Sequence, residues 1–440
     1  MMPEGSAVAT ITYTGRGGIL YPVGTPTERG TASPAVVHGH SEMGPDLHIR
    51  ASLLVTKSGR YSLTQEGVRG PRVLRARSSS HYCPAVRLAR VMAAALLAAV
   101  VGAAAGTLGP FAAAPGAGAV RDPWRSLLAR VPASGTFADF VIVNDYAAAR
   151  AAADLTRHPD RIHDLLVLEK TAGVAPSALV AAPGSGDPLA EELGIRTRDV
   201  ERDVVAGDPP GQLTILEGSI DPAHVRRAVR GDGSFSDRLA TARHAGKRYY
   251  TWGSERVDPL RRTPLRPLGI GGNLAVDPPY VAWSNLAATV EASIDAAAGT
   301  VPSLADDRDL VAVADALQAR GGYAGFLAAH EVAPGVATGG PTPLAPYDAI
   351  AIGPSLEDAD TPVLVVALAY PDAATARSQA GRLRALAEDG TTVTGDRWSE
   401  FVTVDDVTTD GRVVVGRLRT ERPRLWFDVV LRRDSLLASA

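Results

Sequence analysis

Aromatic and cationic side chains concentrate in one short stretch, where they could bind a sugar or an anionic polymer. Aromatic residues are only 5% of the chain. Five of them lie close together: Tyr249, Tyr250, Trp252, Tyr280 and Trp283. Arginines stand between them, including Arg261 and Arg262. Because aromatic faces contact apolar ligand surfaces and guanidinium groups bind carboxylates and phosphates, a ligand groove is one interpretation of this stretch. The sequence favours the other interpretation, in which the rings pack in a core or an interface, since Tyr249 and Tyr280 fit strand patterns.

A second group combines histidines with carboxylates in the segment "RHPDRIHD". His158 and His163 lie beside Asp160 and Asp164, and such side chains can bind Zn²⁺ or act as acid and base. Pro159 interrupts the first helical turn, however, and the sequence indicates no third, distant ligand. We therefore expect a surface loop and a helix start, and we assign no metal ligand, cofactor or catalytic residue.

The familiar catalytic signatures are missing from the sequence. It contains no G-x-S-x-G nucleophile turn, no S-x-x-K motif and no P-loop. His330-Glu331 is followed by Val-Ala-Pro, so the zinc-protease motif H-E-x-x-H is not formed. These absences favour a non-catalytic protein, with a hydrolase of unfamiliar type as an alternative.

Length and composition limit the remaining classes of protein. The chain has 440 residues, a formal net charge of −3 and one cysteine. A single thiol forms neither an intrachain disulfide nor a cysteine-rich metal site. The balanced charge gives no basic field for nucleic acid, so we expect no nucleic-acid partner.

The segment "RVMAAALLAAVVGAAAG" is typical of an export signal. Its basic start, short apolar centre and A-x-A sites are the three parts of a secretory signal, and the residues that carry them are Arg87, Arg90, Leu96, Leu97, Val100, Val101 and Ala105. Residues 91–109 also just reach across a bilayer core as a helix. We therefore predict that residues 86–120 are a cleaved signal peptide or a retained transmembrane anchor plus linker, with the N-terminus inside and the bulk extracytoplasmic.

Residues 1–85 lack a sustained hydrophobic period and are rich in Gly, Pro, Ser and Thr. We predict that they are disordered, or that they are a spurious extension and translation begins near Val86.

The remaining chain alternates strands with helices. Three apolar strands run into an aspartate that can cap a helix: Asp145, Asp221 and Asp372. The end of the chain is rich in apparent strands (401–404, 411–418 and 424–431), with a hairpin turn at 408–411. This pattern predicts an α+β fold with mainly antiparallel sheets and packed helices, divided into α+β domains at 121–335 and 336–440 that are related halves.

Several segments of the body resemble a group of exported actinobacterial proteins of unknown function. The resemblance rests on "RVPASGTFADFVIVNDY", "LEGSIDPAHVRRAV", "YYTWG" and "SLADD", and it covers roughly residues 130–330. It implies export and no particular activity.

These observations lead to three hypotheses about function. The first is an exported or membrane-anchored cell-envelope protein that binds or scaffolds an unidentified ligand, with an envelope polymer, a protein or the membrane (through Val91–Gly109 if uncleaved) as partner. The second is an extracytoplasmic hydrolase that uses the segment around His158 and His163. The third is a membrane-tethered regulator with a cytoplasmic tail.

Overall fold

The computed structural model describes two parts of the chain. In residues 1–122 it describes the backbone of five strands. From Pro123 to Ala440 it describes everything except 156–160, 183–185, 232–238, 253–255, 267 and 339, and the side chains of 161–163. Two compact units result, residues 1–104 and 105–440, and each is described by itself.

The first unit contains a five-stranded sheet in the order β2-β1-β3-β4-β5. Its strands are β1 (Ala7–Thr14), β2 (Val36–Gly39), β3 (His48–Val55), β4 (Arg60–Glu66) and β5 (Arg72–Arg77). β1 and β2 are parallel, and the other neighbours are antiparallel. Strands are thus assigned where the sequence predicted disorder, and the spurious-extension hypothesis stays a prediction. The signal or anchor, with the seven residues named for it, lies outside the described residues.

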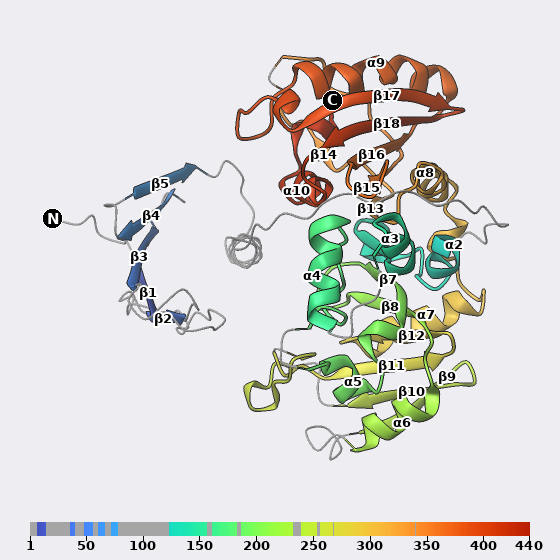
Figure 1. Ribbon diagram of the computed structural model, residues 1–440. Helices are drawn as coiled ribbons and strands as arrows, with labels where there is room; N and C mark the ends of the chain where they lie inside the picture. The colour runs from blue at the N-terminus through green and yellow to red at the C-terminus, as the bar shows by residue number, and fades with distance from the viewer. Residues whose placement is uncertain are drawn as a thin grey trace. The chain divides into compact units, whose positions relative to one another are not determined.

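The second unit is built on one twelve-stranded sheet in which every neighbouring pair is antiparallel (Figure 1). The order is β17-β18-β16-β15-β13-β6-β7-β8-β12-β11-β10-β9. The first half of the chain supplies β6 (Val141–Asp145), β7 (Val200–Ala206), β8 (Leu213–Gly218), β9 (Ala240–His244), β10 (Lys247–Trp252), β11 (Gly272–Asp277) and β12 (Tyr280–Ser284). The second supplies β13 (Ala324–Ala328), β15 (Ala349–Leu356), β16 (Pro362–Ala369), β17 (Val402–Asp410) and β18 (Val413–Thr420).

Helices cover both faces of this sheet. One face carries α3 (Tyr146–Ala152), α4 (Arg161–Thr171), α5 (Pro188–Leu193), α6 (Pro222–Gly231), α9 (Ala373–Asp389) and α10 (Leu425–Arg432). The other carries α2 (Pro123–Leu128), α7 (Ala287–Ala297) and α8 (Arg308–Ala319). The predicted α+β fold with mainly antiparallel strands and packed helices is therefore confirmed. The predicted boundary near residue 335 falls inside this unit, where the sheet is continuous because β13 pairs with both β6 and β15.

Short single-turn helices and two small strands complete the second unit. The helices are η1 (Gly135–Ala138), η2 (Thr197–Asp199), η4 (Pro259–Arg261), η5 (Leu304–Asp306), η6 (Trp398–Glu400) and η7 (Ser435–Leu437). β14 (Ala333–Pro334) pairs in parallel with β19 (Ala438–Ser439). Among the helices in the described parts of the chain, none has the length and apolar character needed to cross a bilayer.

The three predicted aspartate caps are all present. Asp145 accepts a hydrogen bond from the backbone N–H of Ala148, and Asp221 accepts one from Ala223. Asp372 accepts bonds from the N–H groups of Ala374 and Thr375 in the first turn of α9. Each carboxylate satisfies a helix N–H that would otherwise lack a partner.

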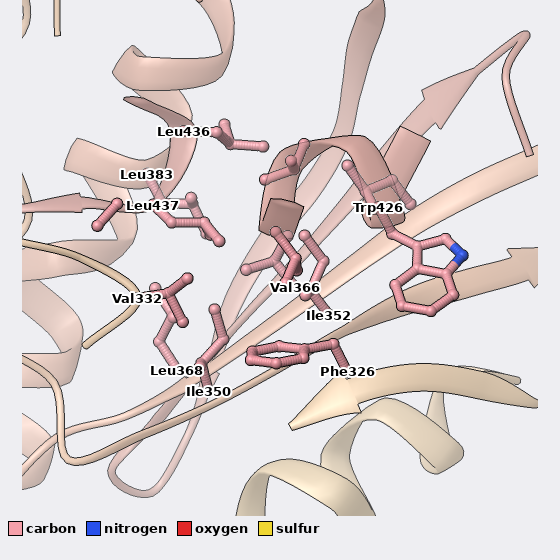
Figure 2. Packing of buried hydrophobic residues seen from close by; sticks show 14 of the residues in the cluster. Phe326, Val332, Ile350, Ile352, Val366, Leu368, Leu383, Trp426, Leu436 and Leu437 are labelled. Atoms are coloured by element: carbon pink, nitrogen blue, oxygen red, sulfur yellow. The ribbon is translucent and has the colours of Figure 1, made fainter. Parts of the chain in front are cut away.

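One local prediction is wrong. The segment 424–431 was expected to be a strand, but residues 425–432 form the helix α10. Its buried side chains, Leu425, Trp426, Val429 and Val430, recur at helical spacing and pack into the large cluster that Figure 2 shows between α9 and the strands β13, β15 and β16. Short apolar runs fit both periods, and here packing decided for the helix.

A buried polar network stands at the middle of the sheet. The carboxyl of Asp203 on β7 accepts hydrogen bonds from Asn144 Nδ2 (2.8 Å), the Tyr146 hydroxyl (2.8 Å) and the Ser177 N–H (3.0 Å). All these groups are buried. Burial raises the pKa of Asp203, and the hydrogen bonds oppose that rise only in part. The network ties the loop after α4 to β6 and β7.

We predict that Tyr146→Phe lowers the free energy of unfolding by about 1.5–3 kcal/mol, because it removes one of the bonds that satisfy a buried carboxyl group. Tyr323→Phe is the matched control. Its buried hydroxyl donates to a neutral carbonyl, that of Ala172, at 2.8 Å, so the expected loss is about 0.5–1.5 kcal/mol. Urea unfolding of both variants measures the difference, and a larger loss for Tyr323→Phe would contradict this account.

Candidate functional site

A pocket of about 200 Å³ opens between α7 and the strands β10, β11 and β12. Its lining combines small or aliphatic residues with polar and charged ones. The apolar lining comes from Ile215, Ala275, Val276, Ala282, Ile294, Ala297 and Ala298, and the polar lining from Arg130, Lys247, Arg248, Asp277, Tyr280 and Ser293. We call this space the α7 pocket.

Arg130 reaches the pocket from the turn that follows α2. That helix buries Trp124, Leu127 and Leu128 against the sheet, which fixes the turn. The Arg130 carbonyl then accepts a hydrogen bond of 2.8 Å from the Ser293 hydroxyl on α7. The position of this arginine is thus set by packing on one side and by α7 on the other.

The guanidinium group of Arg130 has two contacts at the pocket. Its Cζ lies 3.6 Å from the centroid of the Tyr280 ring, a cation–π contact. Its Nη1 lies 3.2 Å from Asp277 Oδ2. The side chain is 20% exposed, so the group is oriented and still accessible.

Lys247 approaches the same carboxylate from the β9–β10 hairpin. Its Nζ lies 3.0 Å from Asp277 Oδ1. The hairpin turn, Ala245-Gly246, has positive φ at both residues (45° and 79°), the conformation that matches the twist of a two-residue hairpin. Lys247 is the first residue after this turn, which points its side chain toward β11.

Charge in the α7 pocket is unbalanced. The cationic side chains of Arg130 and Lys247 both contact the single carboxylate of Asp277. Partial burial raises the pKa of Asp277, but the hydrogen bonds and charges of Lys247 and Arg130 outweigh that effect and hold the pKa below its usual value. The carboxylate therefore stays ionised at neutral pH, and a net positive charge remains for an anionic ligand.

A second cavity of about 220 Å³ lies beside α10 and η6. Part of its polar lining is bonded within one loop: the Thr392 and Thr394 hydroxyls lie 2.8 Å apart, and Thr394 donates to Asp396. Asp434 accepts bonds from two backbone N–H groups. These bonds stabilise the loop itself, so the α7 pocket is the better candidate for a ligand.

The aromatic residues predicted to line one groove divide between the two faces of the sheet. Trp252 and Trp283 are buried on the α6 face, with ring centroids 5.3 Å apart. Tyr250 packs against that same core cluster. Tyr249 is buried on the α7 face, where its hydroxyl donates to Glu291 at 2.7 Å. Only Tyr280 lines the α7 pocket.

The pKa of Tyr249 reflects this burial. Loss of water, followed by the hydrogen bond and charge of Glu291, raises it to about 12.

The predicted arginines lie away from the α7 pocket: Arg261 is half-buried, 3.6 Å from Asp258, and Arg262 is exposed in the same loop. The core-packing alternative therefore describes Tyr249, Trp252 and Trp283.

The histidine–aspartate segment gives no site in the described residues. His158 and Asp160 lie outside them, as does the side chain of His163. Asp164 is buried in an ion pair with Arg150, which has Nη2–Oδ2 and Nε–Oδ1 distances of 2.5 and 3.2 Å. Within the described ranges, no group of three or more His, Cys, Asp or Glu side chains could hold a metal ion.

Sequence reasoning missed Arg130, Lys247 and Asp277. Arg130 is more than a hundred residues from the other two, and only the fold brings it to Tyr280. A weaker signal was present in the sequence, because Asp277 lies close before Tyr280, which it directly opposes across the β11–β12 pair.

Comparison of the chain with protein-family models, with curated proteins and with solved structures finds no match.

We predict that Asp277→Asn lowers the free energy of unfolding at pH 6 by at most about 1 kcal/mol, because both ion pairs are partly exposed. A carboxyl with a lowered pKa stabilises the fold above its unfolded value, here 3.8, and this contribution is lost as pH falls through the folded value. The difference between wild type and variant should therefore shrink in urea unfolding below about pH 4. A difference that is constant with pH would contradict the pairing.

Proposed function

We propose that this protein is an exported or membrane-anchored cell-envelope protein that binds a ligand without catalysing a reaction, and that the α7 pocket holds the ligand's anionic group. The observation that carries the proposal is the shared carboxylate of Asp277. Arg130 and Lys247 both contact it, and its one negative charge cannot balance both. An anion entering the pocket would complete the hydrogen bonding of the two cations.

The lining also restricts the ligand. One wall is formed by aliphatic and small side chains, including Ile215 and Ile294, which favour an apolar chain next to the anionic group. About 200 Å³ accommodates only a small molecule or one end of a larger one. A short-chain carboxylate, or a polymer end of that chemistry, fits both features better than a bare phosphate.

The polar lining supports binding over catalysis. Ser293 is the one hydroxyl of an alcohol side chain among the described lining residues, and it donates to a backbone carbonyl instead of a general base. A nucleophile needs a base within hydrogen-bond reach.

The hydrolase alternative rests on His158 and His163, and the regulator alternative rests on residues 1–85.

Export rests on the sequence alone. The arginines before residue 91, the apolar run that follows and the small-residue sites are the support for it. If that run is retained, the membrane is a partner through Val91–Gly109. The balanced charge supports the absence of a nucleic-acid partner.

We also propose that the two halves of the sheet are related by duplication. Outward from the centre, each half runs through three antiparallel strands, β6-β7-β8 and β13-β15-β16. The third strand of each is followed by an aspartate-capped helix. A later strand, β12 or β18, then returns to pair with it.

We predict that butyrate raises the midpoint of thermal unfolding of the protein, approaching a stabilisation of about 2.7 kcal/mol when its concentration is about 100 times its Kd. Arg130→Gln and Lys247→Gln should each weaken this binding about tenfold or more, since each removes a charge-assisted hydrogen bond. Asp277→Asn should tighten it, because both cations are released.

The control variants remove one positive and one negative charge at positions that do not line the α7 pocket. Arg226→Gln alters an exposed arginine on α6, on the opposite face, and Asp295→Asn alters the α7 carboxylate that pairs with His244 at 2.9 Å. Both should bind butyrate like the wild type. Inorganic phosphate, run in parallel, separates a carboxylate site from a general anion site. An equal response in the pocket variants and the controls, or no response to either anion, would refute the proposal.

A further inference from the structure

Three exposed apolar side chains gather in one loop between β10 and β11. Leu260 is 95% exposed, Val257 is 55% exposed and Leu268 is 43% exposed. The loop comprises residues 256–266 and Leu268, and we call it the arginine loop. Soluble proteins rarely cluster large apolar side chains in water, and such clusters mark surfaces that bind a partner or a membrane.

Hydrogen bonds within the loop fix the backbone conformation that exposes these side chains. The Asp258 N–H donates to the Leu268 carbonyl at 3.2 Å, which closes the base, and the Asp258 carboxylate accepts from the N–H of Leu260 at 3.2 Å. Thr263 and Arg266 exchange two backbone hydrogen bonds of 3.2 and 3.0 Å. The backbone that carries Leu260 is therefore held in place.

The loop is also fastened to the body of the protein. The Thr263 hydroxyl donates to Glu192 Oε2 at 2.7 Å, and the Leu265 N–H donates to the other carboxylate oxygen at 3.3 Å. Leu265 is buried in the same core as Trp252. Gly269, with φ of 66°, comes so close to the Asp258 carbonyl that a Cβ would lie 1.8 Å from it. The apolar side chains thus project from an anchored support.

The loop has more cationic than acidic residues, although Glu255 directly precedes it and Arg261 lies 3.6 Å from Asp258. Its sequence contains four arginines (256, 261, 262 and 266) and one acidic residue, Asp258. Arg256 and Arg262 are exposed beside the apolar side chains, whereas Arg266 is buried over the Trp252 ring, 5.3 Å from its centroid. Exposed apolar groups and exposed cations in one loop match a surface with anionic groups at its outer level and hydrocarbon beneath.

We propose that the arginine loop docks into the headgroup region of an anionic lipid bilayer. Leu260, Val257 and Leu268 enter the boundary between headgroups and acyl chains, and the exposed arginines bind lipid phosphates. A bilayer accepts a projecting apolar tip without a preformed cavity, whereas a protein partner would need an apolar pocket rimmed by acidic side chains.

The test uses the full chain with Cys83→Ser, so that a single introduced cysteine can carry a polarity-sensitive fluorophore. The label is placed at Leu260→Cys, and vesicles contain phosphatidylcholine alone or with phosphatidylglycerol. We expect a blue shift at position 260 with the anionic vesicles and a much smaller one with phosphatidylcholine. Because the label reports its own surroundings, insertion of the apolar segment 91–109 does not produce this signal.

The matched control is Leu431→Cys on α10, which is 46% exposed and should show no shift. Neutralising Arg256 and Arg262 to Gln should weaken the response at position 260 by about fivefold for each charge removed. Arg226→Gln should leave it unchanged.

A label at position 260 that does not respond to anionic vesicles would overturn the proposal and leave a protein as the occupant of the loop. An equal shift at position 431, or an equal shift with phosphatidylcholine alone, would overturn it as well.

Discussion

The pairing of β6 with β13 is the constraint on which the body of the protein depends. Without this ladder the described sheet would separate into seven strands and five. The strands around it approach closely: a Cβ on Gly353 of β15 would lie 2.0 Å from the Ala324 carbonyl of β13. The Asp203 network lies beside β6, and Trp426 Nε1 donates to the Gly173 carbonyl at 2.9 Å, which joins α10 to the loop after α4. These interactions hold the seven-stranded and five-stranded parts of the sheet together.

Much of this fold could be predicted from local signals. Asp145, Asp221 and Asp372 each follow an apolar strand and cap the next helix. This pattern can be recognised within about ten residues of sequence. The helix α10 was missed because the five apolar residues at 425–430 fit both a strand and a helix until their packing partners are known. The continuity of the sheet across residue 335 has no local signal in the sequence. It depends on pairing between β6 and β13, which lie nearly two hundred residues apart.

The candidate site was predictable only in part. Tyr280 was singled out by its aromatic neighbours, yet strand alternation sends those neighbours to opposite faces of the sheet. Arg130 carries no signal in its own sequence context, since its importance comes from the turn after α2 meeting β12. The exposed arginines of the arginine loop belong to a different surface from the α7 pocket. One concentrated stretch of sequence therefore contributes to a core, a pocket and a projecting loop.

We propose that Arg130 and Lys247 present an unbalanced positive charge to a ligand. A crystal of the protein soaked in butyrate tests it most directly. We expect the butyrate carboxylate within hydrogen-bond distance of both cations, with the alkyl chain against α7 and the Tyr280 ring unmoved. Butyrate bound elsewhere, or a pocket that stays filled only by water while Asp277 keeps both cations, would contradict it.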